Sequence, residues 1–87
     1  MAQTRKQLQG IIVVANANPV KVMILNLNTE QEVKSDSQGA FTILAAENDI
    51  LAFSSENLDF TRKIIEKSEF DQQKIVVSMT AKRIVLN

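Results

Sequence analysis

At 87 residues the chain has room for one domain with one hydrophobic core, and with 45% apolar residues it is too hydrophobic for a disordered segment. Its ten basic and ten acidic residues cancel, which argues against nucleic-acid binding and removes the usual polybasic route to anionic membranes. The sequence contains neither cysteine nor histidine, so disulfides, the common zinc sites and histidine-based acid–base catalysis are excluded, and it has no apolar run long enough for a membrane-spanning helix.

The first residues carry little pattern. Ala2, Gln3 and Thr4 are typical of a chain that begins after a signal-peptidase cut, with Met1 added as a start codon. An ordinary disordered start explains them equally well. We therefore expect residues 1–7 to be a disordered or processed segment that precedes the domain.

From residue 8 onward the apolar residues recur with a period of two, which predicts strands. The first strand is expected at 8–14 and ends at the turn formers of 15–19, where Pro19 cannot donate to a central ladder. Residues 20–27 are apolar on both faces, as in a strand at the centre of a sheet. Further strands are predicted at 31–35, 40–44, 49–54, 60–65 and 74–80, with turns at 28–30, 36–39 and 45–48.

The polar segment 67–73 is expected to hold a short helical turn. Residues 57–70 could compete as a longer helix, but their apolar residues form no clean stripe, so a strand is favoured there. Seven short strands with turn signals between them predict an all-β sandwich. Alternation places five side chains in its interior: Phe41, Ile43, Leu51, Phe53 and Val77.

Three patterns in the middle of the chain point to a family. They are Asn26 to Thr29 after the second strand, the Ser-Asp-x-x-Gly-x-Phe-x-Ile hairpin of 35–43, and the Asp-x-Leu-x-Phe-Ser strand of 49–54. Together with Gln9-Gly10 in the opening strand, they resemble the carboxypeptidase regulatory-like domain, a seven-stranded transthyretin-like (prealbumin-like) β-sandwich with Greek-key-type connections. The resemblance covers residues 8–80, which we take as the domain.

The resemblance implies a non-catalytic accessory domain, because such domains stand at the N-terminus of TonB-dependent outer-membrane receptors and in other bacterial envelope proteins. It would be exported to the periplasm or outer membrane and act as a spacer or a protein-interaction module, with a neighbouring domain or another envelope protein as its partner. The alternative is a peptide- or glycan-binding module that uses the loops at one end of the sandwich. The oligomeric state is left open.

Two positions depart from the family pattern. Asn48 stands where the family usually has glycine, and Asn57-Leu58 stands where it usually has Gly-Tyr. Asparagine tolerates a positive φ better than most residues, so we expect a positive φ at Asn48 or Asn57. The missing tyrosine puts in doubt any binding surface built around it.

Residues 81–87 resemble the approach to the motif with which the family leads into a following domain. They are interpreted as a tail or the start of a linker, although a natural C-terminus is an alternative. Ile84, Val85 and Leu86 form an apolar run that we expect to lie along a sheet edge, because an edge offers unpaired backbone groups.

Three sets of residues invite a functional interpretation. Asp36 and Gly39 echo a calcium loop but lack its further acidic ligands, so a plain turn is favoured. Four acidic residues flank one hairpin and could gather, but solvated loop charges are the better interpretation: Glu47, Asp49, Glu56 and Asp59. Five basic residues could form a strip, yet with neither Trp nor Tyr there is no stacking platform for bases or sugars: Arg62, Lys63, Lys67, Lys82 and Arg83. We therefore predict no catalytic residue, no cofactor and no tightly bound metal.

Overall fold

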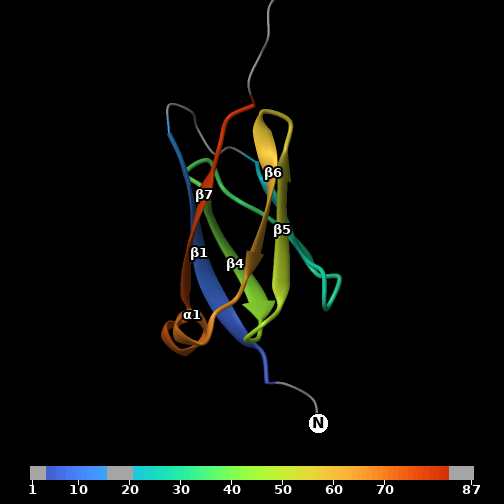
Figure 1. The fold of residues 1–87 in the computed structure, drawn as a ribbon, viewed down its shortest axis with the longest axis vertical. Helices are drawn as coiled ribbons and strands as arrows, with labels where there is room; N and C mark the ends of the chain where they lie inside the picture. Colours follow the sequence, from blue (N-terminus) through green and yellow to red (C-terminus); the bar gives the residue numbers. More distant parts are fainter. Residues whose placement is uncertain (1–3, 16–20, 83–87) are drawn as a thin grey trace, which may run out of the picture.

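The computed structural model describes residues 4–15 and 21–82 and shows two packed β-sheets (Figure 1). The elements are β1 (Lys6–Val14), β2 (Met23–Asn26), β3 (Glu32–Lys34), β4 (Ala40–Ala45), β5 (Ile50–Ser55), β6 (Leu58–Ile64), α1 (Lys67–Gln72) and β7 (Lys74–Met79). One sheet has the order β4-β1-β7 and the other the order β3-β2-β5-β6. The predicted all-β sandwich of seven strands is confirmed, and α1 coincides with the expected helical turn.

The strand β1 lies at the centre of the three-stranded sheet. It pairs antiparallel with β4 and parallel with β7, so the first and last strands of the described chain are neighbours. In the other sheet β2 pairs with β3 and β5 pairs with β6, in both cases antiparallel. The remaining connections pass from one sheet to the other, which holds the two layers together through the chain itself.

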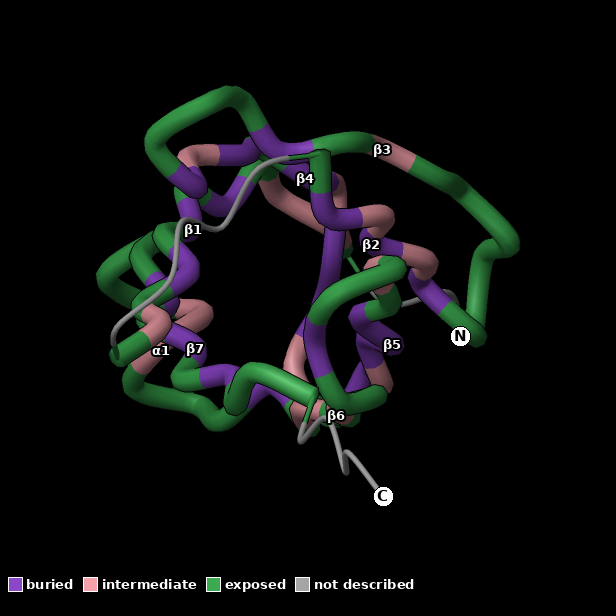
Figure 2. The backbone as a smooth tube through the Cα atoms, turned by 90° about the horizontal axis from the view of Figure 1, so that it is seen from above, coloured by how far each residue is buried: buried purple, intermediate pink, exposed green. Residues whose placement is uncertain are grey.

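The core lies between the two sheets, and alternation supplies much of it, although Leu51, Ala52 and Phe53 of β5 are buried in succession. Buried residues alternate with exposed ones along β1, β4 and β7 (Figure 2). The five side chains predicted for the interior are all buried: Phe41, Ile43, Leu51, Phe53 and Val77. The rings of Phe41 on β4 and Phe53 on β5 meet edge to face across the layers, with centroids 5.7 Å apart and an interplanar angle of 69°. Such pairs add about 0.5–1.5 kcal/mol beyond the area they bury.

Gly10 makes room for one of these rings. It lies opposite Phe41 in the β1–β4 register and faces the core. A Cβ at this position would lie 2.1 Å from Cζ of Phe41, far inside van der Waals contact. The glycine of the opening strand is therefore needed for close packing of the aromatic side chain above it.

Several boundaries differ from those predicted. The strand β1 starts at Lys6, so Lys6 and Gln7 belong to the sheet although they were expected in a disordered or processed segment. The strand β2 starts only at Met23, because Lys21 has a left-handed φ of 56° that interrupts extended backbone. The positive φ predicted for one of two asparagines is found at Asn48 (φ 72°), whereas Asn57 has a negative φ.

Some expectations concern residues outside the described ranges. They are the processed start at Ala2 and Gln3, the turn at 16–19 with Pro19, the start of the second strand at Val20, the basic residue Arg83, and the apolar run Ile84 to Leu86.

Candidate functional site

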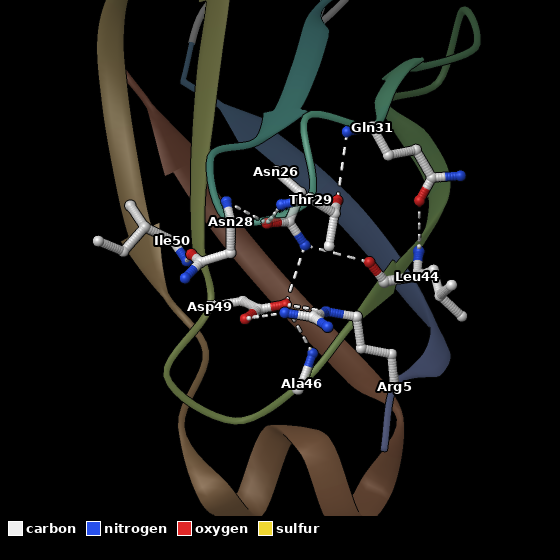
Figure 3. A network of polar contacts seen from close by, with 9 residues as sticks. All are labelled: Arg5, Asn26, Asn28, Thr29, Gln31, Leu44, Ala46, Asp49 and Ile50. Carbon is white, nitrogen blue, oxygen red and sulfur yellow. Dashed lines mark hydrogen bonds and ion pairs between the residues drawn. The ribbon is translucent and has the colours of Figure 1, made fainter. Parts of the chain in front are cut away.

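The most elaborate polar cluster of the domain surrounds Asp49, a carboxylate just before β5 (Figure 3). The guanidinium of Arg5 donates two hydrogen bonds to this carboxylate, from Nε to Oδ2 at 2.9 Å and from a terminal nitrogen to Oδ1 at 3.2 Å. The Oδ2 atom also accepts from Nδ2 of Asn26 (3.0 Å) and from the backbone N–H of Ala46 (2.9 Å). The side chain of Asp49 is only 1% exposed, and that of Arg5 is 27% exposed.

This environment decides the charge of Asp49. Burial on its own would raise the pKa of the carboxyl, because it disfavours the charged form. The hydrogen bonds from Arg5, Asn26 and Ala46, together with the charge of Arg5, outweigh burial and hold the pKa below its ordinary value of 3.8. The same hydrogen bond and charge raise the pKa of Arg5, so both partners are ionised at neutral pH.

Asn26 extends the cluster into the β2–β3 connection. Its Nδ2 also donates to the carbonyl of Leu44 on β4 (3.1 Å), and its Oδ1 accepts from the backbone N–H of Asn28 (2.8 Å) and, at 3.3 Å, from that of Thr29. The Nδ2 group and the Oδ1 atom of this amide are therefore both hydrogen-bonded. One asparagine ties a turn of the four-stranded sheet to β4 of the other sheet and to the Asp49 carboxylate.

Two further side chains extend the same cluster along the connection. Oδ1 of Asn28 accepts from the N–H of Ile50 (3.0 Å), and Oε1 of Gln31 accepts from the N–H of Leu44 (3.3 Å). Within the described chain, no buried side-chain nitrogen or oxygen lacks a partner. A fully satisfied cluster of this kind fixes geometry, and a catalytic role would need an unengaged proton donor or acceptor aimed at solvent.

The prediction for the acidic residues is wrong for Asp49, which is buried and paired rather than solvated. Nor do the four carboxylates gather. Glu47 and Asp49 precede β5, whereas Glu56 and Asp59 follow it. The six residues of β5 separate the two pairs by roughly 20 Å, so no two-carboxylate catalytic site is formed between them.

Asp36 and Gly39 form a turn, as favoured. Oδ1 of Asp36 accepts from the N–H groups of Gln38 (2.8 Å) and Ala40 (2.9 Å), and Gly39 has a positive φ of 86°. The bonds from Ala40 and Gln38 lower the pKa of Asp36. This carboxylate is therefore already hydrogen-bonded to backbone N–H groups, whereas in a calcium loop it would be free to bind the ion. Among residues 4–15 and 21–82, no three acidic side chains are placed to share a metal ion.

The described basic residues make no continuous strip. Nζ of Lys63 lies 2.7 Å from Oε2 of Glu69, and Nζ of Lys67 lies 3.1 Å from Oδ2 of Asp71. Arg62 stacks over the ring of Phe60, 5.6 Å from its centroid. Lys82 lies beside Asn57, which directly precedes β6 and is at the opposite end of that strand from Lys63.

A surface groove of about 450 Å³ lies on the outer face of the sheet β4-β1-β7. The exposed side chains around it come from all three strands and from the turn before β4: Gln9, Ile11, Asp36, Thr42, Lys74 and Val76. The groove is mostly apolar and contains no cluster of ionisable groups. It lies mostly on the sheet face rather than on the loops at the ends of the sandwich.

No family model matches the chain. A search of curated proteins likewise finds no significant match. The residues that carry the resemblance nevertheless have clear structural roles: Gly10 leaves room for the ring of Phe41, and Asp49 holds the Arg5 side chain. Asp36 and Gly39 close a turn, but it connects β3 and β4 of different sheets, so the hairpin expected at 35–43 is not formed. In the part of the chain that the structure describes, no helix has the length and hydrophobicity to cross a membrane.

Sequence reasoning missed most of the Asp49 cluster. One signal was present for Asn26, since it interrupts an apolar run at an inward-facing position, where a polar residue must find partners. The signal for Arg5 was absent, because its partner lies 44 residues away in the sequence and the two come together only through the β1–β4 pairing.

Proposed function

We propose that this domain is a non-catalytic accessory β-sandwich of a bacterial envelope protein and acts as a rigid spacer or protein-interaction module between its neighbours. The envelope context rests on the resemblance to carboxypeptidase regulatory-like domains. The spacer role rests on the path of the chain.

The chain enters and leaves the sandwich at opposite ends (Figure 1). Arg5 stands before β1 at one end, where the ion pair with Asp49 fixes it to the β4–β5 turn. Lys82 stands after β7 at the other end, where its N–H donates to the carbonyl of Asn57 (2.9 Å). Because both ends are fastened to the body of the domain, segments attached to them would be held apart at a fixed distance and orientation. This is the observation that carries the proposal.

The polar groups of the domain also support a non-catalytic role. Its buried carboxylate is fully bonded, its turn carboxylate is bonded to backbone, and Lys63 and Lys67 are paired with acidic residues. General acid–base or nucleophilic catalysis requires a group that is free to exchange a proton or attack a substrate.

The proposal is tested by measuring the distance between the two ends. The chain has no cysteine, so spin labels can be placed at Thr4→Cys and Lys82→Cys, both at exposed positions. Pulsed electron paramagnetic resonance should give one narrow distance distribution. The same labels in an Asp49→Ala background are the matched control, since loss of the anchor of Arg5 should broaden the distribution at the Thr4 end. A broad distribution in the wild-type background contradicts the spacer role.

The envelope context has a separate test. The gene region downstream of codon 87 should encode a further envelope domain, such as a receptor plug and barrel. The alternative expected from the sequence, peptide or glycan binding by the loops at one end of the sandwich, predicts saturable chemical-shift changes in those loops. A different ligand-binding role, in the groove on the outer face of the sheet β4-β1-β7, predicts such changes at Gln9, Ile11 and Val76 upon titration with peptides or glycans.

A further inference from the structure

The outer edge of β7 is unpaired from Lys74 to Ser78. Beyond β7 the same edge is paired with the start of β6, because the carbonyl of Thr80 accepts from the N–H of Asp59 (2.7 Å) and the N–H of Lys82 donates to the carbonyl of Asn57 (2.9 Å). The N–H of Gln9 donates to the carbonyl of Gln73 (3.0 Å), and Gln9 stands opposite Lys74 in the parallel register. In a parallel ladder with this register, the N–H and C=O groups of every second residue of β7, beginning with Ile75, point toward β1. The N–H and C=O groups of Lys74, Val76 and Ser78 therefore point away from β1, and within the described residues they have no partner.

The opposite edge of this sheet is protected. The outward groups of β4 belong to Ala40, Thr42 and Leu44, because the N–H of Ile12 donates to the carbonyl of Gly39. The backbone N–H and C=O of Ala40 are both bonded to Asp36. Those of Leu44 are bonded to the side chains of Gln31 and Asn26. Side chains thus occupy most of the positions at which another strand would pair.

The edges of the second sheet are also unfavourable for pairing with a copy of themselves. The strand β3 is only three residues long, and its outward positions are the charged Glu32 and Lys34. On β6 the N–H of Ile65 donates to Asp49, so the outward groups lie at Phe60, Arg62 and Ile64. Antiparallel pairing of two β6 strands would be centred on Arg62 and would set two guanidinium groups opposite each other, which is destabilising.

The edge of β7 is complementary to itself. When two β7 strands run antiparallel about Val76, each Val76 faces the other, and Lys74 faces Ser78 of the second copy. Every residue with free outward groups then meets another such residue, so a hydrogen-bonded ladder can form without a like-charge pair. We propose that two copies of this chain associate through β7 and join their three-stranded sheets into one continuous sheet.

The exposed apolar side chains support this arrangement. Val76 is 61% exposed, and its neighbour Ile11 in the β1–β7 register is 42% exposed on the same outer face. Pairing about Val76 aligns Ile11 and Val76 of one copy with Val76 and Ile11 of the other in a single row across the joined sheet. An exposed, β-branched edge strand is a site of uncontrolled association unless something limits it, and here the charge of Lys74 and the pairing of Thr80 and Lys82 with β6 limit which strands can add to the edge. The pairing does not depend on the proposed role in an envelope protein.

The first test uses proline, which removes the outward N–H at the centre of the pairing. Val76→Pro takes away a donor that the folded monomer does not use, so it should disturb the fold little. Thr42→Pro is the matched control, because it makes the same change at an outward position of the β4 edge. Sedimentation equilibrium of the full chain should show a monomer–dimer equilibrium. Val76→Pro should weaken it at least about tenfold, and Thr42→Pro should leave it unchanged.

Two results would overturn the proposal. One is a wild-type chain that stays monomeric up to roughly 1 mM, a concentration that detects even weak association. The other is an equal loss of dimer in both proline variants.

A second test does not depend on how well the proline variants fold. The chain has no cysteine, so Val76→Cys introduces a single thiol. Residues opposite each other in a hydrogen-bonded antiparallel pair have Cα atoms about 5.5 Å apart, within the range that a disulfide bridges. Mild oxidation should therefore convert Val76→Cys to a covalent dimer, and Thr42→Cys should remain largely monomeric. Equal crosslinking of the two variants would refute pairing through β7.

Discussion

Replacing Gly10 by alanine should destabilise the domain because of one side chain. The new Cβ would lie 2.1 Å from Cζ of Phe41 and within 2.6 Å of both Cε atoms, whereas ordinary contact begins at 3.4 Å. The tip of the ring would have to retreat by about 1.3 Å, the difference between these distances, in a core where it already touches the fully buried ring of Phe53. Overpacking of this kind costs about 1–3 kcal/mol. The preference of a strand for alanine over glycine offsets about 0.5–1 kcal/mol, so the expected net loss is about 1–2 kcal/mol.

A double-mutant cycle with Phe41→Leu tests this explanation, because leucine lacks the three ring atoms that the new Cβ would meet. In the Phe41→Leu background, Gly10→Ala should be neutral or slightly stabilising, which gives a coupling energy of about 2 kcal/mol. The chain has neither Trp nor Tyr, so urea unfolding is followed by far-UV circular dichroism. An equal cost of Gly10→Ala in both backgrounds would refute the steric argument, and so would a stabilised single variant.

Further outcomes are expected at the turn before β5. Asp49→Ala should lower the free energy of unfolding by about 3 kcal/mol, which is the lower end for a broken buried ion pair because Arg5 keeps access to water. Urea unfolding measures this loss. A loss below about 1 kcal/mol would show that the cluster is dispensable for stability. Because the pKa of Asp49 is lowered on folding, its stabilising contribution is present above the ordinary value of 3.8 and is lost as the pH falls through the folded-state value. Stability should therefore decline on acidification below 3.8, and less steeply in Asp49→Asn; identical pH profiles would contradict this assignment. Because φ is 72° at Asn48, Asn48→Gly should be neutral or slightly stabilising, whereas Asn48→Val should cost about 1–2 kcal/mol. Thermal melting measures both effects. Equal melting temperatures for the two variants would argue against backbone strain. Calorimetric titration with calcium or zinc should show no micromolar binding, and saturable binding would overturn this expectation.

Much of the fold could be predicted because its determinants are local. Alternation along β4 and β7 predicts which side chains face the core, and Asp36 and Gly39 predict the turn between β3 and β4. The parallel pairing of β1 with β7 could not be inferred in this way. It joins segments separated by most of the chain, and a period of two says nothing about which strand lies beside which.

The polar cluster was harder to foresee for a related reason. A carboxylate in a short turn between strands normally faces water, and nothing next to Asp49 in the sequence distinguishes it from Glu47. Its burial is decided by Arg5, which directly precedes β1, and by Asn26 on β2. Only the alternation of the strand, which places Asn26 at an inward-facing position, indicated a buried polar group. That indication required the strand register to be known.

The position of β1 between β4 and β7 has a consequence for how the chain is made. The strand β1 is synthesised first, but its parallel neighbour β7 ends only at Met79. On the ribosome, a growing chain would carry β1 with one side bare until nearly the whole domain had emerged. Long-range pairing of this kind also makes folding slow, on the scale of milliseconds to seconds. We therefore expect the three-stranded sheet of this domain to form only after β7 has been synthesised.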